Sequence, residues 1–305
     1  MKIEIQALEV NHIHGHLLIF PLTRSIAIGC KRVYKIKHKS YGSIERHKAR
    51  LVGKGYTQVE GQDYLDTFSP VAKLTIVRLL LALAAINKWH LKQLDVNNAF
   101  LYKDLNEEVY MVIPQGMNPE KPSLVCKLQR SLYRLKQTSM QWYVRLSSFL
   151  ISHGYKQCSF DYSLFLKHQH NSITALLVYM DDIVLFGNNL IEIWNITQLL
   201  DNAFEIKDLG DLRFFLGFEV ARTSTSINLC QRKYALDILI DIGMLGSKPV
   251  STPFDYITRL HQHSDSPLSA EDVFSYKRLI GKLIYLTNTR SGITFVVQHL
   301  SQFMA

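Results

Sequence analysis

Residues 175–186 read Ala-Leu-Leu-Val-Tyr-Met-Asp-Asp-Ile-Val-Leu-Phe, two apolar runs separated by a pair of acidic residues. Both runs favour β-strands and residues 179–182 form a short connection, so the stretch predicts a hairpin with acids at its tip. Because adjacent carboxylates repel each other and resist burial, Asp181 and Asp182 need a nearby cation. A bound divalent metal ion would meet this need. A solvated turn is the alternative, since Asp is common in turns.

A metal site of this kind needs a third ligand, because Mg²⁺ in phosphoryl transfer is held by a few carboxylates together with substrate phosphates. Residues 90–100 predict a short strand that ends at Asp95, followed by a turn of small residues and by Phe100. Alone, Asp95 would be read as a cap or turn former. Together with the acidic hairpin, it is the candidate third ligand.

Composition limits the class of protein. The chain has 305 residues, of which 47% are hydrophobic, enough for a substantial core and two or three subdomains. The four cysteines are far apart and form no metal-binding pattern, which fits free thiols in a reducing compartment. No signal peptide is evident, and the longest apolar run, residues 79–86, is too short to span a bilayer. We therefore expect a cytoplasmic protein with no membrane partner.

Positive charge is concentrated near the N-terminus. The net charge is +9, and residues 31–54 alone hold nine basic residues against one acidic residue. The basic residues alternate with others on both sides of a turn at residues 40–43, which predicts a two-stranded ribbon with a cationic face. The alternating cations are Lys35, Lys37, Lys39, Arg46, Lys48 and Arg50. Such a ribbon suits phosphates of nucleic acid or nucleotide, whereas a merely solvated face is the alternative.

The remaining pattern is mostly helical. Helices are predicted from about residue 75 to 88, around residues 142–150 with Gly154 as the stop, and in three stripes at 235–242, 276–287 and 293–304. Residues 251–272, rich in Ser, Pro, His and Asp, predict a linker loop.

The order and content of these motifs resemble the reverse transcriptases of copia-type LTR retrotransposons over nearly the whole chain. The matching segments are residues 30–37, 48–58, 66–71, 94–101, 179–182, 215–219 and 251–253. The Tyr-Met-Asp-Asp box at 179–182 would be weak evidence alone. It becomes strong in this order and with these neighbours.

The resemblance implies an α+β fold of the right-hand polymerase type, with fingers, palm and thumb. A mixed, mainly antiparallel palm sheet would pack on helices. We expect an N-terminal leader over residues 1–30, fingers and palm over 31–228, and a helical thumb or connection segment over 229–305. The family continues into a ribonuclease H domain at the point where this sequence ends.

The resemblance also implies an RNA-directed DNA polymerase that uses two Mg²⁺ ions, or Mn²⁺ in their place, to add deoxynucleotides to a primer paired with an RNA or DNA template. The implied site residues fall into four groups. Asp95, Asp181 and Asp182 would bind metal and catalyse; Lys48, Arg50, Phe100 and Gln137 would bind nucleotide, with Phe100 excluding a ribose 2′-hydroxyl; Phe215, Leu216, Gly217, Phe218 and Glu219 would form the primer grip; and Lys35, Lys37 and Lys39 would bind nucleic acid. A virus-like particle within the cytoplasm is a further implied location.

Several positions depart from the family pattern. Arg32 stands where the family usually has Trp, and Tyr41 stands where it usually has Asp. Lys103 and Arg134 replace expected glycines, which would strain any backbone that needs a positive φ. These changes leave a second hypothesis open, a decayed and inactive relic that at most binds nucleic acid. A third, a metal-dependent nuclease or phosphatase, explains the acids but not Phe100 or the primer-grip match.

Overall fold

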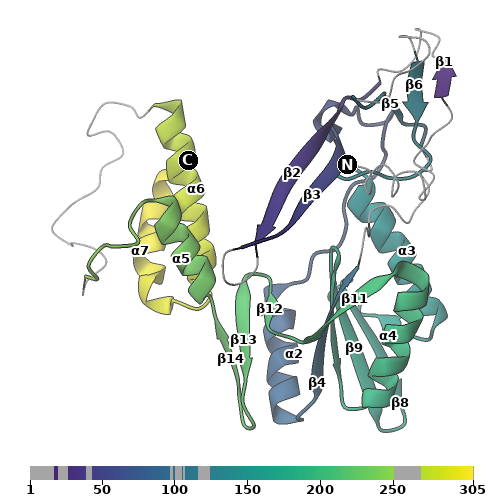
Figure 1. The fold of residues 1–305 in the computed structure, drawn as a ribbon. Helices are drawn as coiled ribbons and strands as arrows, with labels where there is room; N and C mark the ends of the chain where they lie inside the picture. The colour runs from purple at the N-terminus through teal and green to yellow at the C-terminus, as the bar shows by residue number, and fades with distance from the viewer. Residues whose placement is uncertain are drawn as a thin grey trace. The chain divides into compact units, whose positions relative to one another are not determined.

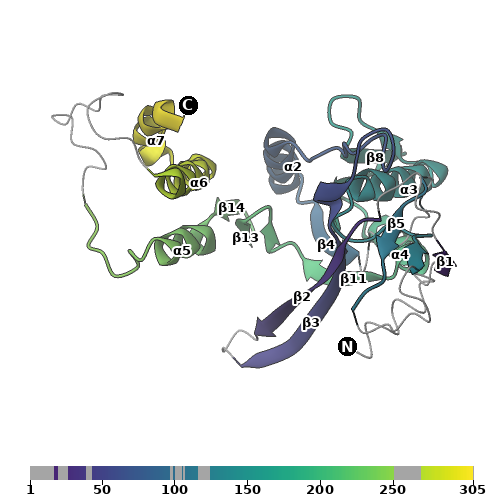
Figure 2. The ribbon, with the colours of Figure 1, turned by 90° about the horizontal axis from the view of Figure 1, so that it is seen from above.

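The computed structural model describes residues 17–19, 27–38, 43–96, 99, 105, 107–115, 124–250 and 269–304. The chain divides into two compact units, Met1–Asp211 and Leu212–Ala305. Figure 1 shows the elements of both units, and Figure 2 shows them from above.

The larger unit is built on a six-stranded sheet. Its strands lie in the order β11-β4-β10-β9-β8-β7, and every neighbouring pair is antiparallel. They are β4 (His90–Val96), β7 (Lys156–Gln157), β8 (Leu164–Gln169), β9 (Ser172–Tyr179), β10 (Asp182–Gly187) and β11 (Ile206–Asp211). The predicted α+β class is confirmed, although these strands form a purely antiparallel sheet and not a mixed one. The hairpin predicted at residues 175–186 is β9–β10, at the centre of the sheet.

Helices cover both faces of this sheet (Figures 1 and 2). Helices α3 (Thr138–Ser152) and α4 (Leu190–Phe204) pack on one face, where Ile183 and Leu185 of β10 join their core. The alternate residues, Val184 and Phe186, are also buried, and helix α2 (Leu74–Ile86) lies on their side. A strand buried on both faces must be apolar throughout, which explains the unbroken hydrophobic run after Asp182. The predicted helices near residues 75–88 and 142–150 are α2 and α3.

A ribbon and a small sheet complete the larger unit. Strands β2 (Cys30–His38) and β3 (Ile44–Gly53) form the predicted two-stranded ribbon, with one register shift near its tip. Strands β1 (Leu17–Ile19), β5 (Tyr110–Val112) and β6 (Leu124–Lys127) form a second sheet. A separate core beneath them includes Ile28, which is 1% exposed. Part of the segment expected to be a leader therefore contributes a strand and a core residue.

Among its described residues, the smaller unit holds a three-stranded sheet and three α-helices. The strands are β12 (Phe214–Phe215), β13 (Phe218–Arg222) and β14 (Ile227–Cys230), and the helices are α5 (Arg232–Asp241), α6 (Ala270–Leu286) and α7 (Thr294–Ser301). The three predicted helical stripes correspond to these helices. The predicted loop at 251–272 is wrong at its end, because α6 begins at Ala270 with Ser269 as its N-cap. Residues 251–268 lie outside the described residues.

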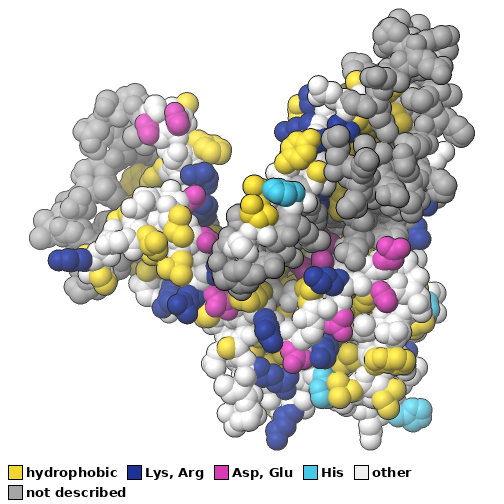
Figure 3. Space-filling model, in the orientation of Figure 1, with side chains coloured by type: hydrophobic (Ala, Val, Ile, Leu, Met, Phe, Trp, Pro, Cys, Tyr) yellow, Lys and Arg dark blue, Asp and Glu magenta, His cyan; other side chains and the backbone are white. Residues whose placement is uncertain are grey.

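The division between the units falls at residues 211–212, so the three-stranded sheet groups with the helices of the smaller unit. The expected functional boundary at residues 228–229 stays a prediction. Figure 3 shows hydrophobic side chains on the surface of these helices. Leu236 and Ile240 of α5 and Phe274 of α6 are exposed. A unit of this size buries only a small core, so many apolar side chains stay at its surface.

Two expectations from composition can be compared with the structure. Within the described residues, no helix has the length and apolar content needed to cross a membrane. All four cysteines are free, with Cys126 buried and Cys230 exposed.

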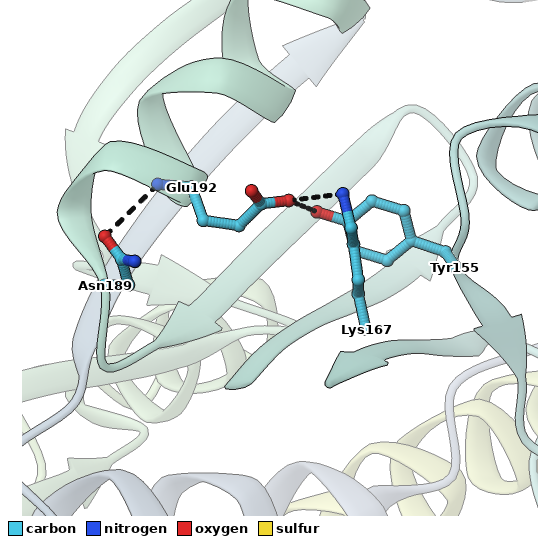
Figure 4. A network of polar contacts seen from close by, with 4 residues as sticks. All are labelled: Tyr155, Lys167, Asn189 and Glu192. Atoms are coloured by element: carbon cyan, nitrogen blue, oxygen red, sulfur yellow. Dashed lines mark hydrogen bonds and ion pairs between the residues drawn. The ribbon is translucent and has the colours of Figure 1, made fainter. Parts of the chain in front are cut away.

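A polar network fixes the start of α4 to the edge of the large sheet (Figure 4). Lys167 on β8 pairs with Glu192 at 2.9 Å, and these side chains are only 18% and 19% exposed. Tyr155 donates a hydrogen bond to the same carboxylate oxygen at 3.1 Å. The Asn189 side chain caps the helix by accepting from the backbone N–H groups of Ile191 and Glu192. One carboxylate therefore satisfies two largely buried polar groups.

Replacing Glu192 by Ala should lower the free energy of unfolding by about 2 kcal/mol, because it leaves the Lys167 ammonium largely buried and unpaired. Urea denaturation followed by tryptophan fluorescence measures this, since Trp89, Trp142 and Trp194 all lie in the larger unit. The matched control is Asp211→Ala, which breaks the 2.9 Å pair with Lys92, a pair whose Asp211 side chain is 78% exposed. That exposed pair should contribute less than about 1 kcal/mol. Equal losses in both variants would contradict the assignment.

Candidate active site

The three predicted metal-binding acids lie at one end of the large sheet. Met180 and Asp181 form a two-residue turn between β9 and β10, and Asp182 is the first residue of β10. On its other side β10 pairs with β4, and this register places Asp182 directly opposite Asp95. The Val96 N–H donates a hydrogen bond to the Asp181 carbonyl at 2.9 Å, which ties the turn to β4. Asp95 and Asp182, 87 positions apart in the sequence, thus meet through the pairing of two strands.

Electrostatics shows that these acids act on one another. Burial, together with the neighbouring charges of Asp181 and Asp95, raises the pKa of Asp182 to about 6. A hydrogen bond from Gln93 Nε2 to Asp182 Oδ1, at 3.4 Å, opposes this shift in pKa. A half-buried carboxyl beside two other carboxyls is stabilised by any cation that approaches it.

The donor atoms suit Mg²⁺, since hard divalent cations bind carboxylate oxygens. However, among the described residues no group of three His, Cys, Asp or Glu side chains is gathered at metal-ligand spacing. The acids are neighbours that do not yet converge, as expected when like charges repel. Rotation of their side chains about χ1 and χ2 would be needed to surround an ion.

Arg50, a predicted nucleotide-binding residue, lies near these acids through Tyr133. Its guanidinium carbon is 4.6 Å from the centre of the Tyr133 ring. Burial raises the pKa of Tyr133, the positive charge of Arg50 opposes that shift, and the charges of Asp181 and Asp95 add to it. The guanidinium and two of the acids therefore act electrostatically on one phenol. This brings the β2–β3 ribbon into the electrostatic environment of the acids.

Sequence reasoning did not identify Tyr133. The residue packs against both the core of the large sheet and the core beneath the ribbon. Its carbonyl accepts a hydrogen bond from the Gly53 N–H at 3.0 Å, at the end of β3. Nothing in the local sequence at residues 133–137 predicts that Tyr133 contacts both cores, because these contacts depend on long-range packing.

The register of the ribbon joins the alternating cations in pairs. Lys35 lies opposite Lys48, Lys37 opposite Arg46, and Val33 opposite Arg50. Lys35 is exposed. For Lys37 and Lys48 the structure describes only the backbone, and Lys39 lies outside the described residues. The pairing places both sets of cations in register, as a single cationic face requires. Their contact with nucleic acid or nucleotide stays a prediction.

Gln137 is buried, at 1% exposed, immediately before the first turn of α3. Its amide donates a hydrogen bond to the Asp63 carbonyl at 2.8 Å and accepts one from Gln58 Nε2 at 3.0 Å. Gln58 in turn accepts from the Lys136 N–H at 2.8 Å. The side chain is thus engaged in joining α3 to the loop after the ribbon. Its predicted contact with a nucleotide remains a prediction.

The predicted primer grip is the β12–β13 hairpin of the smaller unit. Leu216 and Gly217 form its two-residue turn, both with positive φ, at +50° and +74°. Phe215 and Phe218 are buried, and Glu219 accepts a hydrogen bond from the Lys233 N–H at 2.7 Å. The Tyr285 hydroxyl of α6 donates a hydrogen bond to the Leu216 carbonyl. The hairpin is therefore packed on the helices of its own unit. Its role toward a primer stays a prediction.

Two further predicted positions, Phe100 and Lys103, lie outside the described residues. Ala99, just before Phe100, is 2% exposed and belongs to the core of the large sheet. Ala99, three residues after the end of β4, therefore lies in the core.

Arg134 confirms the expected strain at a lost glycine. It has a φ of +70°, in the left-handed region. Its carbonyl oxygen would lie 2.0 Å from a Cβ added at Gly55, so the two backbones approach each other closely at this point. The left-handed conformation costs a residue with a Cβ roughly 1–2 kcal/mol.

Arg134→Gly should raise the free energy of unfolding by about 1 kcal/mol, because glycine adopts this φ without a steric penalty. The control is Lys136→Gly, at an exposed position that is absent from the positive-φ residues. It should lower stability, since glycine adds only unfolded-state freedom there. Both changes are measured by urea denaturation. A loss of stability in Arg134→Gly would contradict the strain argument.

Comparison with known proteins identifies the family. A family model described as reverse transcriptase (RNA-dependent DNA polymerase) matches residues 17–256. The chain is 41% identical over 305 residues to the retrovirus-related Pol polyprotein from transposon RE1 of Arabidopsis thaliana, a match that covers all of this chain and 21% of that protein. It is 37% identical over 285 residues to the corresponding polyprotein from transposon TNT 1-94 of Nicotiana tabacum, covering 90% of this chain and 21% of the relative. The chain thus spans about a fifth of the length of these relatives.

Among solved structures, a foamy viral protease–reverse transcriptase in complex with double-stranded DNA is similar, with a TM-score of 0.43 and 14% identity over 92% of this chain and 40% of that one. The sequence motifs and the polyprotein relatives agree on a copia-type retrotransposon. The chain belongs to the reverse transcriptase (RNA-dependent DNA polymerase) family.

Proposed function

We propose that this chain is an RNA-directed DNA polymerase that transfers a deoxynucleotide to the 3′ hydroxyl of a primer. The observation that carries the proposal is the register between β4 and β10, which sets Asp95 opposite Asp182 and beside the turn that holds Asp181. Membership of the reverse transcriptase family supports nucleotide transfer as the reaction. The position of the three acids supports this end of the sheet as the place where the reaction occurs.

In the proposed reaction, the primer 3′ oxygen forms a bond to the α-phosphorus of the incoming nucleotide. The bond from that phosphorus to the bridging oxygen breaks, pyrophosphate leaves, and the 3′ hydroxyl loses its proton. Asp95, Asp181 and Asp182 would hold two Mg²⁺ ions, or Mn²⁺, between them. When bound, these ions lower the pKa of the hydroxyl and neutralise charge on the triphosphate.

The positive groups support the same assignment. Arg50 lies over Tyr133, whose pKa responds to Asp95 and Asp181. Its guanidinium would pair with a triphosphate held by metal at those acids. Arginine suits this role because its planar donors match phosphate oxygens. Lys48, two positions earlier on β3, would assist. Lys35, Lys37 and Lys39 would contact the template–primer backbone.

Selection of the sugar and placement of the primer complete the proposal. Phe100, five residues after Asp95, would lie beneath the nucleotide sugar and exclude a 2′-hydroxyl. The hairpin at residues 215–219 would hold the primer end, and its turn is suited to that task because it is rigidly packed on Tyr285.

Primer extension on an RNA template with Mg²⁺ and deoxynucleotides tests the proposal. The parent should extend the primer, and Asp95→Asn and Asp181→Asn should each lower kcat by at least about 100-fold, because each removes a metal-binding charge. Asp201→Asn, at an exposed position of α4, is the matched control and should keep parental activity. Salt-dependent binding of the template–primer without extension by the parent would overturn the proposal in favour of the inactive relic.

The raised pKa of Asp182 predicts a pH-dependent stability. The folded value of about 6 lies above the ordinary value of 3.8, so the folded state binds this proton more tightly than the unfolded state. The favourable contribution is fully present below about pH 4 and is lost as the pH rises through 6. Without metal, Asp182→Asn should therefore be more stable than the parent at pH 7.5, by about 1 kcal/mol after allowance for solvent screening. Near pH 4 the difference should vanish.

The same two proteins are compared by urea denaturation with and without Mg²⁺. Magnesium should stabilise the parent more than the variant, because only the parent keeps all three charges. The control Asp201→Asn should follow the parent in every condition. An Asp182→Asn protein that is less stable than the parent at pH 7.5 without metal would disprove the electrostatic account.

A further inference from the structure

We propose that Trp142 is a positioning residue that holds the acid-bearing turn in its working conformation. The inference rests on the proposed function, since it concerns the same acids. Trp142 lies on α3, is 2% exposed, and donates a hydrogen bond from its indole Nε1 to the Met180 carbonyl oxygen at 2.8 Å. That carbonyl belongs to the peptide group from which Asp181 begins.

The turn needs an external support because its backbone is strained. Met180 has a φ of +56° at the first central position of a two-residue hairpin, a place that favours glycine. A residue with a side chain keeps such a conformation only where its surroundings impose it. The Met180 side chain is 44% exposed, so packing of that side chain is only part of the constraint. Hydrogen bonds to the backbone supply the rest.

Two hydrogen bonds hold consecutive carbonyls of this turn from different elements. Trp142 of α3 binds the Met180 carbonyl, and the Val96 N–H of β4 binds the Asp181 carbonyl at 2.9 Å. Asp181 lies between the two anchored groups, so the direction in which its side chain leaves the backbone is fixed from both sides. The hydrogen bond from Val96 forms whenever β4 lies beside the turn. The hydrogen bond to the Met180 carbonyl depends on the side chain of Trp142 alone.

The indole is itself fixed in place. Its ring meets Phe204 edge to face, with centroids 5.2 Å apart and planes at 86°, inside the core shared by α3, α4 and the sheet. A buried indole N–H needs an acceptor, and the turn carbonyl provides one. A rigid donor pointing at a strained carbonyl is therefore a specific constraint on the turn.

The test removes the donor and keeps the shape. Trp142 is replaced by β-(3-benzothienyl)alanine, in which sulfur takes the place of the N–H, and in a second variant by Phe. The matched control is Phe204→Leu, which disturbs the same core but leaves the hydrogen bond in place. Hydrogen–deuterium exchange of residues 180–184 should speed up about tenfold in both Trp142 variants, the effect expected for one lost hydrogen bond. Phe204→Leu should instead lower overall stability without this local change.

Kinetics separates positioning from structure. In primer extension at saturating Mg²⁺ the Trp142 variants should lose about tenfold in kcat, with KM for deoxynucleotide within about twofold, because the metal sites are then filled and only the placement of the acids is altered. Mn²⁺ alone, titrated by electron paramagnetic resonance, should bind about tenfold more weakly to these variants. Faster turn exchange with unchanged kcat and unchanged Mn²⁺ binding would overturn the proposal, as would unchanged exchange in the benzothienyl variant. If the parent extends no primer, the proposed function fails, and exchange with Mn²⁺ binding still decides the role of Trp142.

Discussion

The pairing of β4 with β10 is the constraint on which the candidate site depends. It brings Asp95 and Asp182 face to face although both are acidic and Asp182 is half-buried. Cross-strand neighbours of like charge destabilise a sheet. The apolar residues that follow on β10 offset this cost, because they are buried on both faces of the sheet. Hydrophobic burial in the centre of the strand therefore maintains an unfavourable charge arrangement at its end.

Backbone strain is held in a similar way at two hairpins, β9–β10 and β12–β13. Met180 and Leu216 both have positive φ at the first position of a two-residue turn. In each case an aromatic side chain from a helix of the same unit donates a hydrogen bond to the carbonyl of the strained residue, Trp142 to one and Tyr285 to the other. The two turns share no sequence, so their common arrangement reflects a common need. A turn that must present its residues in one direction is better fixed by a buried donor than by its own propensity.

Local pattern in the sequence carried much of the fold. Hydrophobic periodicity and composition predicted the acidic hairpin, the strand near Asp95, α2, α3 and the cationic ribbon. The structure contains each of them. The pairing of β4 with β10, the antiparallel order of the whole sheet and the placement of Ile28 in a core could not be read from periodicity, because they are long-range contacts. Tyr133 and Trp142 were missed for the same reason: each looks like an ordinary aromatic until its neighbours are known. At Gln137 the sequence predicts a contact with a ligand, whereas the structure shows the side-chain amide hydrogen-bonded to Gln58 and Asp63. The sequence pattern did not predict these contacts within the protein.

Repulsion among the three acids and backbone strain at Arg134 both destabilise the larger unit, but they have different physical causes. The repulsion among the acids disappears when a cation binds, so it is coupled to the proposed function. The strain at Arg134 has a different origin, because it comes from a positive φ and a close approach to the backbone of Gly55 and not from charge. Arg134 adjoins Tyr133, whose ring lies under Arg50 and senses Asp95 and Asp181. A local shift that relieved the strain would therefore move the tyrosine on which the cationic ribbon and the acids converge. The departure at position 134 thus weakens the fold at a point where the proposed site has little tolerance for movement.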